Sequence, residues 1–455
     1  MIGERSIPHD AALPALEALF PPQGAPPFIA EAIGDLTGRD VQPEALDVTY
    51  VRYRPGKSCV VLWSHQDKAG ARPLASARLF HNQRARKLLG RDTNRDLIQR
   101  AATLNKNAGV PYRYFPEQRL LLQLFPLDLQ LPQLVLAADP VWLREHLGAN
   151  GSRPNADEIA ATPVSYKPGR RCVYRYDVAA GGKRESYYAK LFRDDRGEEL
   201  LAWHQTISSS LSASHAPWTI PTAAGYIPEA RMLLFEDFAG ATKVRTLLRP
   251  ALKDAATKQQ LLGYISAAAE GLAAFQQSPI DNLPSQSPQE LVDAFRKDCA
   301  GIAAIAPDLA AEATEVLDRL QSAARAFPPE PLVPTHGAFR HDQLLHAEDR
   351  LIVLDLDTIC LSGASADAGN FLGYLDLTAI RRPRLQPIIN DCARTFVAAV
   401  KGAGQTSPQW VAWYRAAAHV KKGLRAFYSL KPNWPETATR LLSLSGDTLR
   451  EARAA

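Results

Sequence analysis

An internal repeat constrains the fold of this chain more than any other sequence feature. Three short blocks occur twice in the same order. YRPGKSCVV at 53–61 returns as YKPGRRCVY at 166–174, ARLF at 77–80 as AKLF at 189–192, and YFPEQRLLLQLF at 114–125 as YIPEARMLLFEDF at 226–238. The copies lie 112 or 113 residues apart. A nearly constant spacing indicates a duplicated structural unit.

Each copy is rich in β-branched and aromatic residues around a Pro-Gly pair. Proline fixes φ and glycine permits positive φ, so the pair predicts a tight turn between two strands. A third strand, a helical stretch and a second hairpin follow. The sequence therefore predicts a lead-in at 1–45, a first β-rich unit at 46–150 and a second at 160–240.

Beyond residue 240 the apolar residues recur at helical spacing. This period predicts helices at 258–275, 289–305 and 310–327, and again from 370 to the end, with a strand-and-loop insert at 331–356. The chain has 455 residues, of which 46% are hydrophobic, so it can build several domains. The prediction is an α+β protein whose helical part spans 241–455.

The polar segment at 335–375 carries the chemistry. A loop from His336 to Gln343 precedes a charged turn at Glu348–Arg350 and the predicted strand LIVLDLD, which ends in Asp355 and Asp357. Two residues apart on a regular strand, these aspartates would point the same way. Carboxylate and amide oxygens meeting at a strand end suit Mg²⁺ bound to phosphates.

This segment resembles the aminoglycoside phosphotransferase and choline kinase superfamily, which has a protein-kinase-like fold. His336-Gly337 matches the opening of its catalytic loop, HGDxxxxN, and Gln343 stands at its metal-binding asparagine. Asp355 matches its metal-binding aspartate, and Asp367 a later structural aspartate. The resemblance implies a bilobal kinase-like fold with a duplicated β-rich N-lobe-like unit and a mainly helical C-lobe.

Two departures from the family pattern stand out. Ala338 occupies the position of the catalytic aspartate, and Ser362-Gly363-Ala364 replaces Gly-Asp-Pro. The alanine is compatible with an engineered substitution, with another carboxylate (Asp342 or Asp357) or no base at all, or with a protein that binds nucleotide without transfer. Changes at 343 and 362–364 favour natural divergence. Arg340 is a candidate cation for the transferred phosphate, or a surface arginine.

The resemblance also assigns nucleotide contacts to the second β-rich unit. Lys190 would pair with the phosphates, with Glu199 or the adjacent Glu198 as its ion-pair partner. Gly169 lies in the turn expected to cover the phosphates. The segment 233–240, with Glu236 and Phe238, resembles the hinge that binds adenine through its backbone. In the first unit Arg78 stands in place of Lys190, which predicts no nucleotide there and leaves 46–150 as a possible protein-partner surface.

The predicted activity is transfer of phosphate from Mg²⁺-bound ATP or GTP to a hydroxyl of a small molecule. The alternatives are a pseudokinase that binds nucleotide or a partner, and a kinase-fold AMP transferase. A cationic acceptor would need acidic residues. The helical part offers Asp281, Glu290, Asp293, Asp298 and Asp376.

Composition narrows the remaining classes. A net charge of +5 with no dense basic stripe disfavours nucleic-acid binding. No run of eighteen apolar residues predicts a membrane span, and the N-terminus lacks the apolar core of a signal peptide. Five isolated cysteines suggest reduced thiols and a cytoplasmic protein.

Overall fold

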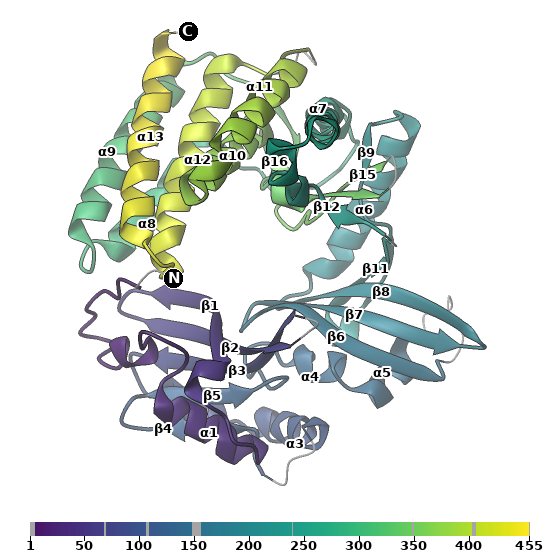
Figure 1. The fold of residues 1–455 in the computed structure, drawn as a ribbon, viewed down its shortest axis with the longest axis vertical. Helices are drawn as coiled ribbons and strands as arrows, with labels where there is room; N and C mark the ends of the chain where they lie inside the picture. Colours follow the sequence, from purple (N-terminus) through teal and green to yellow (C-terminus); the bar gives the residue numbers. More distant parts are fainter. Residues whose placement is uncertain are drawn as a thin grey trace. The chain divides into compact units, whose positions relative to one another are not determined.

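The chain divides into two compact units. A computed structural model describes residues 5–67, 70–105, 109–147, 156–238, 240–347, 350–402 and 406–454 (Figure 1). Unit 1 comprises Met1–Leu201, Ala223–Asp237 and Tyr428–Asn433; unit 2 comprises Ala202–Thr222, Phe238–Phe427 and Trp434–Ala455. Parts of the predicted features lie outside the described residues: 1–4 of the lead-in, 68–69, 106–108 and 148–150 of the first β-rich unit, Ala239 of the hinge segment, Glu348 and Asp349 of the charged turn, and 403–405 and 455 of the helical part.

Unit 1 contains two five-stranded antiparallel sheets with the same strand order. The first runs β1-β2-β3-β5-β4 and the second, in corresponding order, β6-β7-β8-β11-β10. The strands of the first are β1 (Leu46–Arg54), β2 (Ser58–Asp67), β3 (Gly70–Phe80), β4 (Tyr112–Phe115) and β5 (Leu120–Leu124). Those of the second are β6 (Glu158–Lys167), β7 (Arg171–Ala180), β8 (Lys183–Phe192), β10 (Ala223–Ile227) and β11 (Met232–Glu236). The predicted duplication is confirmed.

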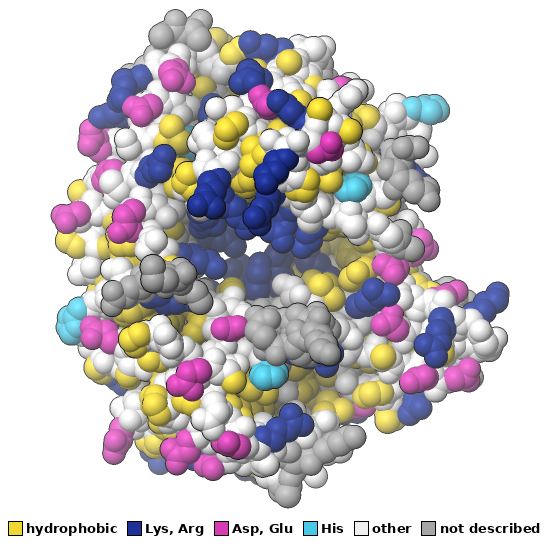
Figure 2. All heavy atoms as spheres, in the orientation of Figure 1, with side chains coloured by type: hydrophobic (Ala, Val, Ile, Leu, Met, Phe, Trp, Pro, Cys, Tyr) yellow, Lys and Arg dark blue, Asp and Glu magenta, His cyan; other side chains and the backbone are white. Residues whose placement is uncertain are grey.

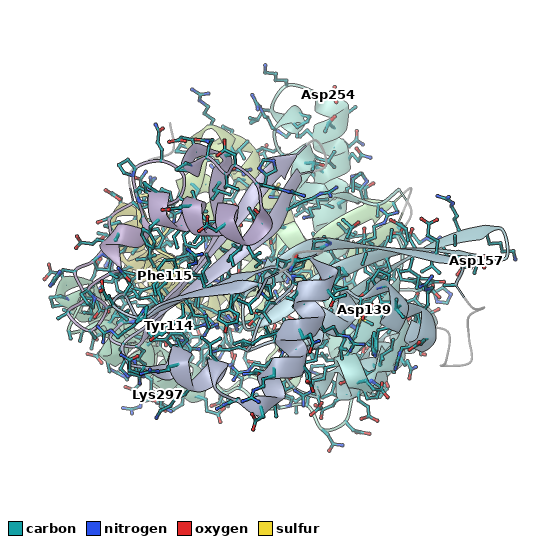
Figure 3. The ribbon with its side chains drawn as sticks, turned by 90° about the horizontal axis from the view of Figure 1, so that it is seen from below. Tyr114, Phe115, Asp139, Asp157, Asp254 and Lys297 are labelled. Atoms are coloured by element: carbon teal, nitrogen blue, oxygen red, sulfur yellow. The ribbon has the colours of Figure 1, made fainter. Side chains whose placement is uncertain are left out.

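Short helices precede each sheet, and further helices separate its third and fourth strands. Before the first sheet lie η1 (Glu17–Leu19), α1 (Pro27–Thr37) and η2 (Pro43–Ala45); within it lie α2 (Arg84–Leu89), η3 (Asp92–Asn94) and α3 (Arg95–Leu104). For the second sheet, α4 (Gln133–Ala137) and α5 (Pro140–Leu147) come before it, α6 (Arg196–Ala213) separates the third and fourth strands, and η4 (Pro228–Ala230) lies between the fourth and fifth. Asp139 begins α5 by accepting the N–H of Val141 at 3.0 Å (Figure 3).

A buried aspartate anchors the first turn of each sheet. In the first copy, Asp10 Oδ2 accepts the Tyr53 hydroxyl at 2.7 Å and the Gly56 N–H at 2.8 Å. In the second, Asp128 Oδ2 accepts the Tyr166 hydroxyl at 2.9 Å and the Gly169 N–H at 2.5 Å.

These aspartates reveal a fourth repeated block. Asp10 and Asp128 occupy the same place in PHDAALPAL at 8–16 and PLDLQLPQL at 126–134. The repeat therefore includes part of the predicted lead-in, and the anchor of the second sheet lies within 46–150, the range predicted for the first unit.

Unit 2 is mainly helical, as predicted. Its helices are α7 (Ala255–Gln276), α8 (Pro288–Ile302), α9 (Pro307–Ala326), α10 (Ala366–Arg381), α11 (Gln386–Gly402), α12 (Pro408–Tyr428) and α13 (Trp434–Ala454), with the 3-10 turns η5 (Val244–Leu247), η6 (Pro250–Leu252) and η8 (Pro383–Leu385). Asp254 caps α7 by accepting the Thr257 N–H at 2.7 Å (Figure 3). Every described helix is too short or too polar to cross a lipid bilayer.

Two small sheets frame the polar segment of unit 2. One has the order β12-β14-β15-β9, and the other pairs β13 with β16. Their strands are β9 (Trp218–Thr219), β12 (Thr242–Lys243), β13 (Leu332–Thr335), β14 (Leu344–Ala347), β15 (Arg350–Val353) and β16 (Cys360–Gly363). The turn η7 (His341–Gln343) joins the loop after β13 to β14. The strand predicted for LIVLDLD ends earlier than expected, at Val353.

Glycines bring α10 and α12 close together. A Cβ at Gly369 would lie 2.5 Å from Tyr414 Cβ, and one at Gly373 would lie 2.7 Å from Ala418 Cβ. Both contacts are too short for a real side chain, so the two helices approach more closely than larger residues would allow. This packing sets the positions of the residues on the facing turns of both helices.

Candidate active site

The loop from His336 to Gln343 is held by a buried aspartate at the start of α10. Asp367 is fully buried, and its carboxylate accepts the N–H of His336 at 2.6 Å and of Gly337 at 3.0 Å. Burial raises the pKa of Asp367, while these backbone donors oppose the rise. The loop thus has a fixed backbone, in the structural role that the resemblance implied for Asp367.

The His336 side chain is also buried within the protein rather than exposed to solvent. Its side chain is 1% exposed, and Nε2 lies 2.9 Å from the carbonyl oxygen of Leu354. Phe339 is buried against Phe371, with ring centroids 5.5 Å apart, and its carbonyl accepts Asn370 Nδ2 at 2.7 Å. Ala338 therefore lies between two immobilised neighbours, and its methyl group offers no proton acceptor.

Gln343 and Asp355 come together beside this loop. Gln343 Nε2 donates to Asp355 Oδ2 at 3.3 Å, whereas the buried Gln343 Oε1 has no hydrogen-bond partner. Asp355 lies two residues beyond β15 with φ of 74°. The regular strand expected through Asp355 and Asp357 is thus absent, because the backbone leaves the extended conformation there. The alternation of side chains along a regular strand therefore gives no basis for expecting Asp355 and Asp357 to point the same way.

These two residues fit a divalent cation. An unsatisfied buried amide oxygen beside a carboxylate is a hard-oxygen donor pair, the type that Mg²⁺ prefers when phosphates and water complete its coordination. Among the described residues no group of three or more His, Cys, Asp or Glu side chains could hold a metal unaided. Such a cation would depend on oxygens from the ligand.

Arg340 and Asp342 form a pair at the end of the loop. Arg340 Nε donates to Asp342 Oδ1 at 2.5 Å, and another guanidinium nitrogen donates to the Tyr374 hydroxyl at 3.0 Å. The Arg340 guanidinium carbon lies 5.0 Å from the centre of the Tyr374 ring. Asp357, the second candidate base, is half-buried in the turn that follows Asp355.

The other predicted site residues belong mostly to unit 1. Lys190 is half-buried on β8, where it pairs with Leu233 of β11. Glu198 and Glu199 are both exposed in the first turn of α6. Glu236 ends β11 and is exposed. Phe238 is half-buried in the first residues of unit 2.

The turn at Gly169, which was expected to cover the phosphates, does not offer the N–H of Gly169 as a free donor. Gly169 has φ of 66°, is buried, and gives its N–H to Asp128. A Cβ at this position would lie 2.4 Å from a terminal nitrogen of Arg78. The Arg78 side chain, which stands where the second copy has Lys190, therefore packs against the turn of the second copy.

The acidic residues considered for a cationic acceptor have other roles. Asp376 accepts two hydrogen bonds from Arg415, both at 2.7 Å, and one from His419 at 2.8 Å. Glu290 completes the capping box of α8 with Ser287. Asp281, Asp293 and Asp298 are exposed. Two of the five acidic side chains are therefore engaged by neighbouring groups, and the other three are exposed.

A group of basic residues was missed by the sequence analysis. Lys421, Lys422 and Arg425 lie on α12 and Arg381 on α10. Figure 2 shows Lys and Arg side chains gathered over the part of unit 2 that contains these two helices. The available signals were KKGLR at 421–425 and IRR at 380–382 in otherwise apolar helices.

Fold and site together define a protein of the kinase-like class. A five-stranded antiparallel sheet with one intervening helix precedes a helical unit, in which Asp355 and Gln343 lie beside a loop opened by His-Gly. The model of the phosphotransferase enzyme family matches residues 174–399. This match confirms, over that region, the resemblance to the family drawn from the sequence.

Several solved kinase structures are similar to this chain at low sequence identity. A choline/ethanolamine kinase family protein from Mesorhizobium loti is 13% identical with a TM-score of 0.44, covering 69% of this chain and 92% of its own. Choline kinase from Cryptosporidium parvum Iowa II is 12% identical, with a TM-score of 0.46 and coverage of 68% and 94%. A glucosamine kinase in complex with glucosamine, ADP and inorganic phosphate is 14% identical, with a TM-score of 0.43 and coverage of 92% and 97%. A comparison with curated proteins gave no match.

Proposed function

We propose that this protein transfers a phosphoryl group from a Mg²⁺-bound nucleoside triphosphate to a hydroxyl of a small molecule, without an aspartate at position 338. The observation that carries the proposal is the Gln343–Asp355 pair, with its unpartnered buried amide oxygen. A polar acceptor buried without a partner costs free energy, so its retention indicates a ligand that satisfies it.

Each residue then has a part in binding or positioning. Asp355 and Gln343 would hold the divalent cation, which supplies charge neutralisation to the phosphates when bound. Lys190 would pair with phosphate oxygens, and Glu199 would orient it. Backbone groups at Glu236 and Phe238 would contact the base of ATP or GTP.

Alanine at position 338 cannot accept the proton of the acceptor's hydroxyl group, so another group would have to do so if a base is used. Asp342 already accepts a hydrogen bond from Arg340. Asp357 and Asp342 are both candidates for a substitute base, and Asp342 also holds Arg340. Because phosphoryl transfer relies mainly on positioning and charge stabilisation, slow transfer without any base is also consistent with the site.

Nucleotide binding provides the first test. Thermal unfolding would be followed with ATP or GTP, with and without Mg²⁺, for the unmodified chain and for Asp355→Asn, Gln343→Leu and Lys190→Ala. Preferential binding to the folded state raises the midpoint. We expect a Mg²⁺-dependent rise that all three substitutions reduce, and an unchanged rise in the control Asp281→Asn, which alters an exposed aspartate. The absence of any rise at millimolar nucleotide would refute the proposal.

Ala338→Asp distinguishes a slow enzyme from a binding protein. General-base assistance contributes about 10²–10⁴-fold to such steps. If positioning is intact, this substitution raises the rate of phosphoryl release or transfer by a factor in that range, measured by conversion of ATP to ADP over an acceptor panel. A chain that binds nucleotide yet shows no turnover before or after the substitution is a pseudokinase, the alternative that Ala338 favours.

A further inference from the structure

Two adjacent lysines on α12, Lys422 buried and Lys421 half-buried, lack an opposite charge of their own. Lys422 is 4% exposed, and its Nζ lies 3.5 Å from the centre of the Tyr374 ring. Neither Lys422 nor Lys421 makes a hydrogen bond or an ion pair with any residue in the part of the chain that the structure describes. Burying an ammonium group without such partners is costly.

The surrounding charges increase this cost. Arg425 on the same helix and Arg340 in the loop act on both lysines, and Arg381 of α10 also lies near Tyr374 and Arg425. Cys360 of β16 and Asp342 act in the opposite direction, but Asp342 is already bonded to Arg340. Burial and these cations lower the pKa of Lys421, and that of Lys422 well below its ordinary value.

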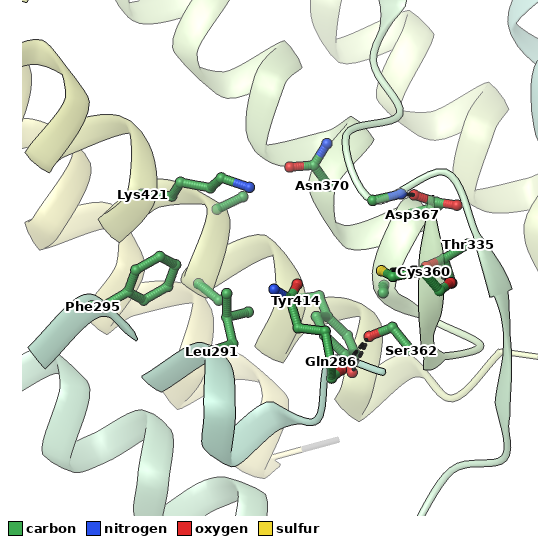
Figure 4. Close-up of a pocket in the computed structure, with 14 residues that line it drawn as sticks. Gln286, Leu291, Phe295, Thr335, Cys360, Ser362, Asp367, Asn370, Tyr414 and Lys421 are labelled. Carbon is green, nitrogen blue, oxygen red and sulfur yellow. Dashed lines mark hydrogen bonds between the residues drawn. The ribbon is translucent and has the colours of Figure 1, made fainter. Parts of the chain in front are cut away.

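Lys421 adjoins a pocket that reaches the loop of the candidate active site. Lys421 lines it together with Thr335, Gly337 and Asn370. Figure 4 shows the Lys421 ammonium group pointing into this space towards Asn370, on the side away from Gln286 and Ser362. Gly337 precedes Ala338, so the pocket borders the position where a hydroxyl acceptor would react.

From this arrangement we infer that Lys421 and Lys422, with Arg340 and Arg425, bind an anionic group of the acceptor, a carboxylate or a phosphate. The acceptor is then an anionic hydroxy compound rather than a cationic one. An anion would supply the counter-charge that the two lysines lack, and it would be held by charge-assisted hydrogen bonds. That the bound anion belongs to a phosphoryl acceptor rests on the proposed phosphotransferase function. The existence of the anion site does not.

Titration calorimetry with inorganic phosphate and with malonate, at constant ionic strength, tests the site. We expect binding of at least one probe, weakened about tenfold or more by Lys421→Met and by Lys422→Met. The control Lys297→Met removes an exposed lysine of α8 and should change nothing. The tighter probe identifies the anionic group. Binding should also take up protons, measured in buffers of different ionisation enthalpy, because a bound anion raises the pKa of both lysines.

The outcomes separate this site from the nucleotide site. Lys190→Ala should leave phosphate binding intact. Phosphate binding that Lys190→Ala abolishes and the α12 variants retain would overturn the inference, as would no heat with either probe. Removal of an unpaired buried cation relieves a cost, so both methionine variants should fold, which circular dichroism verifies. Anion binding without any nucleotide effect would support the site and reject the phosphotransferase proposal.

Discussion

Asp376 is a carboxylate whose hydrogen bonds stabilise the folded protein rather than bind a ligand. Burial opposes its ionisation, but hydrogen bonds from His419 and Arg415 lower the pKa of Asp376 to about 2. In an unfolded chain the value is about 3.9. A lowered pKa contributes stability that is present above the unfolded value and is lost as pH falls through the folded value.

We therefore predict that Asp376→Asn lowers the free energy of unfolding at neutral pH by about 2–3 kcal/mol. Urea unfolding at a series of pH values measures the effect. The difference from the unmodified chain should be constant above about pH 5 and should shrink as pH falls towards 2. A difference that stays constant over the acid range would show that the ionised carboxylate is not its source.

The candidate site residues that the sequence predicts in the helical part lie in one continuous segment. His336, Gln343, Asp355 and Asp367 all fall within 335–375, so a motif with fixed spacing identifies them. Lys421 and Lys422 follow much later, and nothing local indicates which helix will pack against the loop. Their position depends on the close approach of α10 and α12 at Gly369 and Gly373, a tertiary fact. The positive φ of Asp355 could not be predicted from the sequence either, because the pattern of LIVLDLD predicts a longer strand.

The two hairpin turns of the repeat offer a comparison at the scale of the element. Gly56 and Gly169 have nearly the same φ, 64° and 66°, and each donates its N–H to an anchoring aspartate. A Cβ at Gly56 would meet nothing within 4 Å, whereas one at Gly169 would lie 2.4 Å from Arg78. An alanine substitution at Gly56 therefore tests the backbone conformation alone. At Gly169 it also tests packing against Arg78.

We predict that Gly56→Ala costs about 1 kcal/mol and Gly169→Ala about 2–4 kcal/mol of stability. Chemical denaturation of the two variants provides the measurement. Equal costs would mean that Arg78 moves aside without loss, and the packing of Arg78 against the second turn would then be unimportant.

Helix positions in unit 2 were predicted well because amphipathic period and proline breaks act locally. The predicted helices at 258–275, 289–305 and 310–327 correspond to α7, α8 and α9 within a few residues. The capping box at Ser287 and prolines at several first turns explain the agreement. Pairing between strands distant in sequence, such as β3 with β5, was not predicted, because no local pattern indicates it.

At the scale of the whole molecule, each unit has its own buried core, and the repeat anchors belong to unit 1. Asp128 is 1% exposed, and its loss would leave the Tyr166 hydroxyl and the Gly169 N–H without their acceptor. The comparable aspartate Asp157 accepts the Gly181 N–H at 3.0 Å but is exposed.

Asp128→Ala should therefore cost about 2–4 kcal/mol and Asp157→Ala less than about 1 kcal/mol. Hydrogen exchange by mass spectrometry should show lost protection in β6, β7 and β8 for Asp128→Ala, with little change in α9 and α13 of unit 2. Uniform loss of protection across both units would contradict separate cores and indicate a single cooperative structure.

The position of Asp128 also decides where this chain can be cut. The repeated blocks around the Pro-Gly turns suggest a boundary near residue 160, and the phosphotransferase family match begins at 174. A fragment starting at either point would carry the second sheet but lose the carboxylate that fastens its first turn. Expression of the kinase-like portion should begin ahead of Pro126, so that the segment PLDLQLPQL travels with the sheet that it anchors.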